Sequence, residues 1–396
     1  MADIVDRVTA DDEGGRIART LLLPYLNHAA NMYGVGYATA ADIDAGMRFG
    51  CGYPIGPLAL IDALGAKTVV DGLNEQFAKT GDPLHRPDAK LVEVADAGAS
   101  FTDDDADGTA VPEVKRPVSK VGVVGTGTMA SGIAQVFAQA GYDVVYVGRS
   151  QEKLDGVVGY VTKNLDRAVA KGKLDEDAKA TILGRLTGAT EREALGDVDL
   201  VVEAIAEDLD IKLELFRDLD RICKPGAILA TTTSSLSIAA CAEVTSRPAD
   251  VIGMHFFNPA PVMKLVEVVT TDATAADVDE TVRALCLATG KHPVSCGDRA
   301  GFIVNALLFP YLNDAIKLQE SGAASMEQID TAMKETKLPM GPFELLDVVG
   351  NDVSLAIQET LVGAFGHEGW QPADSLKQVV AEGKLGRKTK AGFHTY

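Results

Sequence analysis

A histidine and a glutamate twelve positions apart are the residues best suited to acid–base chemistry. His255 lies at the end of an apolar run that is typical of a strand, and Glu267 lies inside the next strand-like run. If these strands pair, the carboxylate contacts the imidazole, holds one tautomer and favours its charged form. Such a pair suits a base that removes a proton from an alcohol. From the spacing alone, a buried structural histidine and a surface glutamate remain an equally good interpretation.

A glycine-rich turn between an apolar run and a helical pattern indicates a dinucleotide site. Gly125 and Gly127 follow the predicted strand 121–124, and Ala130 fills the third small position before the helix. Gly125 permits the tight turn, while Gly127 lets the backbone approach phosphate oxygens. A glycine pattern alone is weak evidence, but a second strand follows on schedule at 142–147. The sequence therefore predicts a βαβ unit that binds a pyrophosphate at a helix N-terminus.

The chain also contains an internal repeat. The heptapeptide LLLPYLN at 21–27 returns as LLFPYLN at 307–313, and PIGPLALID at 54–62 returns as PMGPFELLD at 339–347. The apolar residues of each copy recur at helical spacing, and each Pro-X-Gly-Pro element predicts a turn that starts a helix. We therefore expect two related helical domains, one at each end of the chain.

These elements predict an α/β plus all-α architecture, a Rossmann-type domain flanked by two helical domains. We expect a helical copy over 1–98, an acidic solvated linker over 99–118, the dinucleotide domain over 119–297 and the second helical copy over 298–396.

Composition narrows the function classes. The chain has 396 residues, 46% of them hydrophobic and 24% charged, as in ordinary soluble proteins. A formal net charge of −20 disfavours nucleic-acid and anionic membrane partners, so an anionic ligand needs local basic residues. The five cysteines form no CxxC pair, and no apolar signal core or membrane-spanning run is present. We expect a cytoplasmic protein without a metal site.

Several separate motifs together resemble the L-3-hydroxyacyl-CoA dehydrogenase family, which includes 3-hydroxybutyryl-CoA dehydrogenases. The resemblance covers residues 119–396, and the first helical copy resembles the family's C-terminal domain placed ahead of the dinucleotide domain. The motifs, in chain order, are GTGTM at 125–129, VEAIAE at 202–207, TSSL at 233–236, HFFNP at 255–259, GFIVN at 301–305 and PMGP at 339–342.

The resemblance implies roles for four residues in chemistry. His255 would take the proton of the substrate's 3-hydroxyl while a hydride passes from C3 to a nicotinamide. Glu267 would orient the imidazolium and balance its charge. Ser234 and Asn305 would hydrogen-bond the reacting oxygen or the thioester and fix the reactive geometry.

The resemblance also implies ligand contacts. An acyl-CoA is the expected partner, and two positions match family contacts to coenzyme A, Asn164 and Lys171. Taken alone, Lys171 is better interpreted as a solvated helix charge, and the match to the family makes the two interpretations equally good. Other positions match cofactor contacts: Gly125, Gly127, Thr128, Met129, Glu207, Lys212, Ser234, Asn258 and Lys388.

One departure from the family pattern bears on the cofactor. Relatives commonly have an acidic residue at the end of the second strand, where it binds ribose hydroxyls, but this chain has Gly148-Arg149-Ser150. Loss of the carboxylate relieves repulsion of a 2′-phosphate, and Arg149 can bind that phosphate through charge-assisted hydrogen bonds. We predict a preference for NADP(H), with NAD(H) as the alternative.

Other departures concern the helical copies. The first copy has Arg19 where the second has Asn305, and it lacks a counterpart of residues 386–388. We predict that it is no second active site but packs on residues 298–396 as an internal pseudo-dimer that buries apolar helix faces. A homodimer of whole chains stays open. Ala306 also stands where relatives often have an arginine, so we expect a local ion pair to be missing there.

The sequence thus favours an oxidoreductase that interconverts (S)-3-hydroxyacyl-CoA and 3-oxoacyl-CoA, with 3-hydroxybutyryl-CoA and acetoacetyl-CoA as the preferred pair. One alternative is a dehydrogenase of a hydroxy acid without coenzyme A, against which Asn164 and Lys171 argue. Another is a catalytically silent family member, which the intact set Ser234, His255, Glu267 and Asn305 disfavours.

Overall fold

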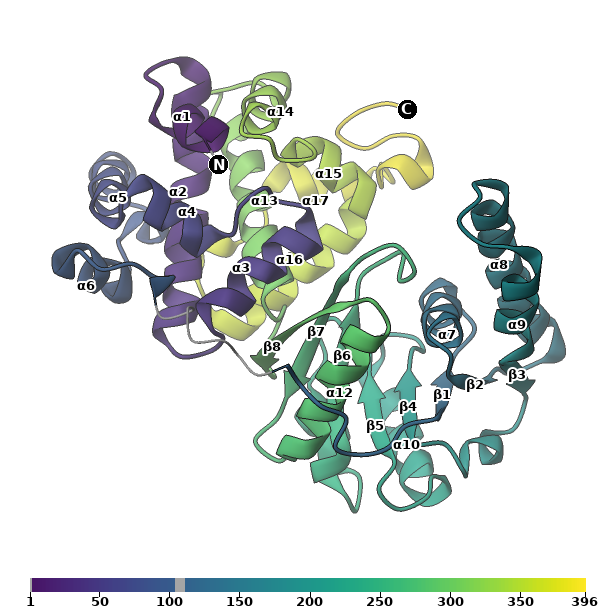
Figure 1. The fold of residues 1–396 in the computed structure, drawn as a ribbon. Helices are drawn as coiled ribbons and strands as arrows, with labels where there is room; N and C mark the ends of the chain where they lie inside the picture. Colours follow the sequence, from purple (N-terminus) through teal and green to yellow (C-terminus); the bar gives the residue numbers. More distant parts are fainter. Residues whose placement is uncertain (1, 104–110) are drawn as a thin grey trace. The chain divides into compact units, whose positions relative to one another are not determined.

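The computed structural model describes residues 2–103 and 111–396 and divides the chain into two compact units (Figure 1). One unit combines both ends of the chain, Met1–Gly108 and Ala300–Tyr396, and the other is Thr109–Arg299. The helical copies predicted at opposite ends of the sequence therefore belong to the same unit.

An eight-stranded sheet forms the centre of the second unit, with strand order β3-β2-β1-β4-β5-β6-β7-β8. Strands β1 to β6 pair in parallel, β7 is antiparallel to β6, and β8 is parallel to β7. The strand bounds are β1 (Lys120–Val124), β2 (Asp143–Val147), β3 (Leu186–Ala189), β4 (Leu200–Glu203), β5 (Ile228–Thr231), β6 (Val251–Phe256), β7 (Leu265–Thr270) and β8 (His292–Gly297).

Helices link the parallel strands, because a parallel pair needs a crossover that a tight turn cannot supply. Every residue of β4, β5 and β6 is buried, as expected for strands covered on both faces. The helices of this unit are α7 (Thr128–Gln139), α8 (Gln151–Ala170), α9 (Glu176–Gly184), α10 (Leu209–Ile222), α11 (Ile238–Glu243) and α12 (Ala276–Ala288).

The sheet topology dictates where a ligand can bind. The chain proceeds outward from β1 to β2 and β3, then returns to the other side of β1 for β4. Loops that follow β1 and β4 therefore leave the sheet in diverging directions and open a crevice at the carboxyl ends of the strands. The glycine-rich turn, Arg149 and the segments after β4 and β5 all lie at this edge of the sheet.

The described residues of the first unit form helices and the loops between them, with short β-bridges near the C-terminus. The first copy contains α1 (Ala2–Thr9), α2 (Glu13–Gly34), α3 (Ala40–Cys51), α4 (Pro57–Leu64), α5 (Ala66–Thr80) and α6 (Ala89–Ala97). The second contains α13 (Val304–Glu320), α14 (Met326–Glu335), α15 (Pro342–Val349), α16 (Asn351–Phe365) and α17 (Asp374–Ala381).

The two copies pack on each other with the reciprocity of a two-fold interface. Helix α2 packs against α13 and α14, while its counterpart α13 packs against α2 and α3. Tyr25 and Tyr311 occupy equivalent positions, and their ring centroids are 6.1 Å apart. A residue that contacts its own equivalent lies next to the symmetry axis, so the contact between the copies is isologous.

The segment predicted as a solvated linker is anchored at both of its described ends. Phe101 N donates to Asp62 Oδ1 at 2.9 Å, and the Arg116 guanidinium pairs with Asp250 at 2.6 Å and Asp277 at 2.8 Å. Residues 104–110, the middle of the predicted linker, lie outside the described residues. Side chains far away in the sequence therefore hold both described ends of the predicted linker in place, although residues 111–115 are mostly exposed.

Three properties concern the described residues as a whole. None of their helices is long and apolar enough to cross a membrane. The five cysteines form no disulfide, and four of them are buried. Within the described ranges, no cluster of three or more His, Cys, Asp or Glu side chains is placed to hold a metal ion.

Candidate active site

A cavity of about 770 Å³ lies at the carboxyl ends of β1, β2 and β4, lined by the turn that follows β1. Gly125 has φ +129°, and a Cβ there would lie 2.4 Å from the carbonyl oxygen of Ala204. The turn therefore requires glycine at position 125 for both its conformation and its packing.

The N-terminus of α7 faces the same cavity. Gly127 is the N-cap of this helix, no side chain caps it, and Thr128 and Met129 in the first turn line the cavity. A Cβ on Gly127 would meet nothing within 4 Å, so a side chain there would occupy space that an incoming phosphate can use. Uncapped first-turn N–H groups and the helix dipole favour an anion. The cradle fits the pyrophosphate of a dinucleotide.

Basic side chains gather at the end of the cavity beside β2. Arg149 lies two residues after the end of β2, and Lys153 and Arg192 line the same cavity. Arg149 is predicted from the sequence, whereas Lys153 and Arg192 are not. Lys153 lies in the first turn of α8, three residues after the N-cap Ser150. This short distance from Arg149 in the sequence could have indicated that Lys153 lines the same cavity. Arg192 comes from the segment after β3, which no local spacing connects to Arg149.

The structure brings His255 and Glu267 together. They are directly opposed in the antiparallel pair β6–β7, and His255 Nδ1 lies 2.6 Å from Glu267 Oε2. The Glu267 side chain is fully buried, and the Phe257 ring lies 4.6 Å from the imidazole between centroids. Because the carboxylate engages Nδ1, Nε2 is the ring nitrogen that would exchange a proton with a substrate.

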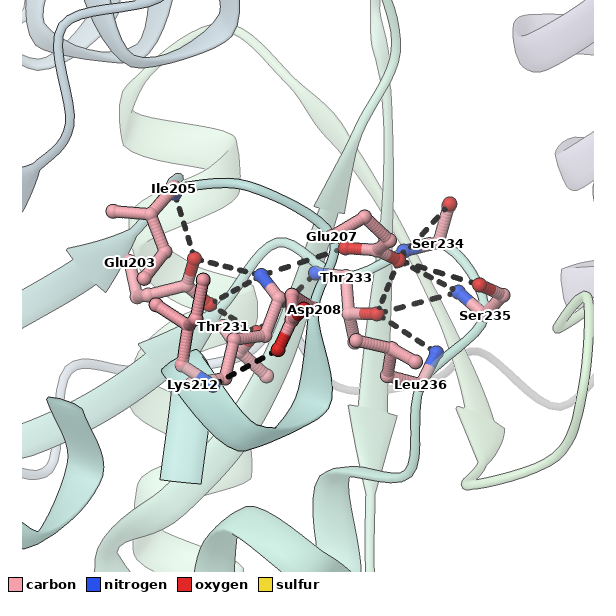
Figure 2. Close-up of polar contacts among 11 residues, drawn as sticks. Glu203, Ile205, Glu207, Asp208, Lys212, Thr231, Thr233, Ser234, Ser235 and Leu236 are labelled. Atoms are coloured by element: carbon pink, nitrogen blue, oxygen red, sulfur yellow. Dashed lines mark hydrogen bonds and ion pairs between the residues drawn. The ribbon is translucent and has the colours of Figure 1, made fainter. Parts of the chain in front are cut away.

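Ser234 lies in the turn after β5, and this turn wraps around the carboxylate of Glu207 (Figure 2). Thr233 Oγ1 donates to Glu207 Oε1 at 2.6 Å, the Ser234 amide donates at 2.9 Å, and the Ser234 hydroxyl lies at 3.3 Å. Burial opposes ionisation of Glu207, but the Thr233 hydrogen bond and the charge of Lys212 outweigh it and lower the pKa of this carboxyl. Glu207 therefore carries a negative charge at neutral pH.

Lys212 lies behind this turn and is only 1% exposed. Its Nζ is 2.7 and 2.8 Å from the two carboxylate oxygens of Glu203 and 3.4 Å from Glu207 Oε2. Glu203, fully buried at the end of β4, also accepts hydrogen bonds from Thr231 Oγ1 at 2.6 Å and Ile205 N at 2.7 Å. Glu203 is not predicted from the sequence as a site residue. A glutamate at the end of an apolar strand could have indicated a buried, paired carboxylate.

Three other predicted positions of this unit are more exposed. Asn164 Nδ2 donates to Gln135 Oε1 at 2.9 Å, so α8 and α7 are joined there. Lys171 is the exposed C-cap of α8. Asn258 is exposed and precedes a cis proline peptide bond.

Two predicted residues belong to the helical unit. Asn305 is buried in the first turn of α13. Lys388 lies near the C-terminus, with its Nζ 2.5 Å from Asp352 Oδ1. Within that unit, Lys388 is a half-exposed cation beside a carboxylate.

The fold and the cavity define a nucleotide-binding protein of the Rossmann type, and comparisons with known proteins define the family. Residues 120–299 match the 3-hydroxyacyl-CoA dehydrogenase NAD-binding domain, and residues 15–104 and 301–396 each match the 3-hydroxyacyl-CoA dehydrogenase C-terminal domain. The chain belongs to the 3-hydroxyacyl-CoA dehydrogenase family and is a nicotinamide-dependent oxidoreductase of that class. It carries the helical domain of the family twice.

Individual relatives agree. The chain is 45% identical over 278 residues to a 3-hydroxybutyryl-CoA dehydrogenase of Clostridioides difficile, a match that covers 70% of this chain and 99% of the relative. It is 44% identical over 307 residues to the mitochondrial hydroxyacyl-coenzyme A dehydrogenase of Homo sapiens, covering 73% and 95%. The crystal structure of (S)-3-hydroxybutyryl-CoA dehydrogenase from Ralstonia eutropha matches with a TM-score of 0.69 at 41% identity, covering 71% and 99%.

Proposed function

We propose that this protein interconverts (S)-3-hydroxyacyl-CoA and 3-oxoacyl-CoA, with 3-hydroxybutyryl-CoA and acetoacetyl-CoA as the preferred pair. The observation that carries the proposal is the 2.6 Å contact between His255 Nδ1 and the fully buried carboxylate of Glu267. The names of similar proteins support the substrate, because several are 3-hydroxybutyryl-CoA dehydrogenases.

In the proposed mechanism, His255 exchanges the proton and Glu267 supports it. In the oxidative direction, His255 Nε2 takes the proton of the 3-hydroxyl and the buried carboxylate stabilises the imidazolium that forms. In the reductive direction, the imidazolium returns this proton to the 3-oxo oxygen. The nicotinamide, when bound, accepts or supplies the hydride of C3. Ser234 and Asn305 are proposed to hydrogen-bond the reacting oxygen or the thioester.

Steady-state reduction of acetoacetyl-CoA tests this proposal. We expect His255→Ala to lower kcat by roughly 10²–10⁴-fold, because a positioned general acid–base contributes that much, while the nucleotide still binds. A variant that keeps the turnover of the unchanged protein would remove the mechanism. Activity on the free hydroxy acid but not on its thioester would instead favour the alternative without coenzyme A, and would remove the role proposed for Asn164 and Lys171.

We further propose NADP(H) as the preferred cofactor. Support comes from Arg149 and Lys153, which line the same cavity in a chain whose formal net charge is −20. Arg192 also lines this cavity, although its guanidinium pairs with Asp218. A 2′-phosphate there would form charge-assisted hydrogen bonds. Comparison of kcat/KM for NADPH and NADH tests the preference, and Arg149→Asp should shift it toward NADH. Equal values, or a higher value with NADH for the unchanged protein, would contradict it.

The duplicated helical domain is proposed to act as an internal pseudo-dimer. The reciprocal packing of α2 and α13 around Tyr25 and Tyr311 supports this arrangement. Deletion of residues 1–118 should expose the apolar face of α13, so light scattering should detect association or aggregation of the shortened chain. A soluble, fully stable monomer of that chain would contradict the proposal.

A further inference from the structure

Helix α3 of the first copy packs against the start of α13, the helix that carries Asn305 in the second copy (Figure 1). The closest approach is at Gly46, inside α3, where a Cβ would lie 3.1 Å from Ile303 Cγ2 and 3.7 Å from Val304 Cγ2. Ile303 and Val304 directly precede Asn305, and they are 0% and 1% exposed. The backbone of α3 therefore forms one wall of the place where α13 begins.

The equivalent contact on the other side of the pseudo-two-fold axis is looser. The segments IDAGM at 43–47 and IDTAM at 329–333 correspond in the repeat, so Ala332 is the equivalent of Gly46. Ala332 and Ile17, the equivalent of Ile303, line a cavity of about 420 Å³. A glycine inside a helix destabilises the helix relative to alanine, so its presence in α3 alone is explained by the close approach to α13.

The backbone that leads into α13 needs support from its surroundings. Gly301 has φ +74°, and Phe302 has φ +48°, in the left-handed region that a bulky residue rarely adopts. Such a conformation persists only where the surrounding packing enforces it. Ile303 follows Phe302 and is the residue against which Gly46 packs. The place of Asn305, two residues after Ile303, therefore depends on a contact that the first copy supplies.

We infer that Gly46 is a positioning residue, which sets the place of the Asn305 amide through Ile303 and the first turn of α13. The first copy thus supports the reaction without forming a second active site. The inference rests on the proposed function, since Asn305 is proposed to hydrogen-bond the reacting oxygen or the thioester. The effect on the rate is measurable, because a misplacement of about 1 Å at a reacting group lowers the rate by about 10²-fold.

A larger side chain at position 46 tests the inference. Gly46→Val should displace Ile303 and lower kcat for acetoacetyl-CoA about 10-fold, while the dissociation constant of the reduced nucleotide, measured by its fluorescence, stays within about twofold. Ala332→Val is the matched control, because it adds the same side chain at the equivalent position, beside a cavity, and should leave kcat within about twofold. Equal losses of kcat in the two variants would overturn the inference.

Gly46→Ala is a milder variant, in case Gly46→Val fails to fold. Its methyl group requires Ile303 to move by a few tenths of an ångström, so kcat should fall about threefold. Leucine has no Cγ2 atom and nearly the volume of isoleucine, so adding Ile303→Leu should restore most of the lost kcat. A loss of kcat that Ile303→Leu does not reverse, or no loss in Gly46→Ala, would contradict the positioning role.

A double-mutant cycle with Asn305→Ala separates the inference from the proposed function. In the Asn305→Ala background, Gly46→Val should cause no further loss of kcat, because no amide remains to be positioned. Losses that multiply fully would show that Gly46 acts elsewhere and would overturn the inference alone. An Asn305→Ala variant with unchanged kcat would remove the role proposed for Asn305 and this inference with it, so the two failures are distinguishable.

Discussion

The two helical copies share their packing and differ where one of them carries functional groups. A buried aspartate holds the start of the same helix in each copy: Asp44 accepts from Leu58 N at 2.7 Å, and Asp330 accepts from Phe343 N at 2.9 Å. A second aspartate holds the chain that follows the last helix, through Phe101 N and Phe393 N, both at 2.9 Å. Duplication has therefore preserved the bonds that maintain the scaffold.

The two copies differ most clearly in the chain that follows their last helix, α6 in the first copy and α17 in the second. Asp62 and Asp347 bind equivalent backbone groups, but Phe101 follows Gly98 by three positions, whereas Phe393 follows Gly383 by ten. The extra residues of the second copy include Lys388. The first copy thus keeps the anchor and lacks the segment between the helix and the anchor, which is where the proposed cofactor contact lies.

The long central helices, α2 and α13, differ as well. Arg19 occupies the position of Asn305, and its guanidinium donates to the carbonyl oxygens of Val8 at 2.8 Å and Ala10 at 2.7 Å. In the first copy this position therefore fixes α1 and the loop after it. The same place in the scaffold holds a structural residue in one copy and a proposed substrate contact in the other.

The largest expected effect is a loss of activity when Asn305 is replaced, compared with replacement of its equivalent in the first copy, Arg19. Asn305→Ala should lower kcat for acetoacetyl-CoA by about 10²–10³-fold, as loss of a donor to a developing oxyanion does. Arg19→Ala should leave kcat within about twofold and instead lower the free energy of unfolding by roughly 1–3 kcal/mol, because two carbonyl groups lose a charged donor. Steady-state kinetics and urea unfolding measure both variants. Comparable losses of kcat would show that the first copy also serves the reaction.

A smaller effect, on the KM for the nucleotide, should distinguish the equivalent aspartates Asp62 and Asp347. Asp62→Asn and Asp347→Asn each remove acceptors from backbone N–H groups, so each should lower the free energy of unfolding by about 1–3 kcal/mol. Only Asp347→Asn releases the segment that carries Lys388, so only this variant should raise the KM for the nucleotide, by about tenfold. If both variants left the KM unchanged, the role proposed for Lys388 would be wrong.

Local sequence patterns predict much of this molecule, because the contacts concerned are local or follow from strand pairing. The turn at Gly125 and the repeat of the helical domain can be read directly. The contact between His255 and Glu267 follows once two consecutive strands pair in antiparallel fashion. The family and the fold class were confirmed by the domain matches.

Local patterns do not predict contacts between segments that are distant in sequence. Arg192 reaches the cavity beside Arg149 only because β3 lies next to β2 in the sheet. Thr231 bonds Glu203 because β4 and β5 are neighbours, with these two residues in register. The anchoring of Phe101 by Asp62 spans 39 residues and turned the first part of a predicted solvated linker into a bound segment. Burial and sheet order decide these contacts, and neither is visible from spacing.

Another pair of equivalent positions, His28 in the first copy and Asp314 in the second, gives a prediction about stability alone. Burial raises the pKa of Asp314 to about 7; Asp82 adds to this shift and Lys317 opposes it. Since the unfolded chain loses this proton near pH 4 and the folded one near pH 7, stability should fall as the pH rises through this window. Asp314→Asn cannot ionise, so it should increase the free energy of unfolding at pH 8 by on the order of 2 kcal/mol and change it little at pH 4. Urea unfolding at both pH values measures this difference, and an equal change at both would mean that the carboxyl group of Asp314 titrates normally in the folded protein.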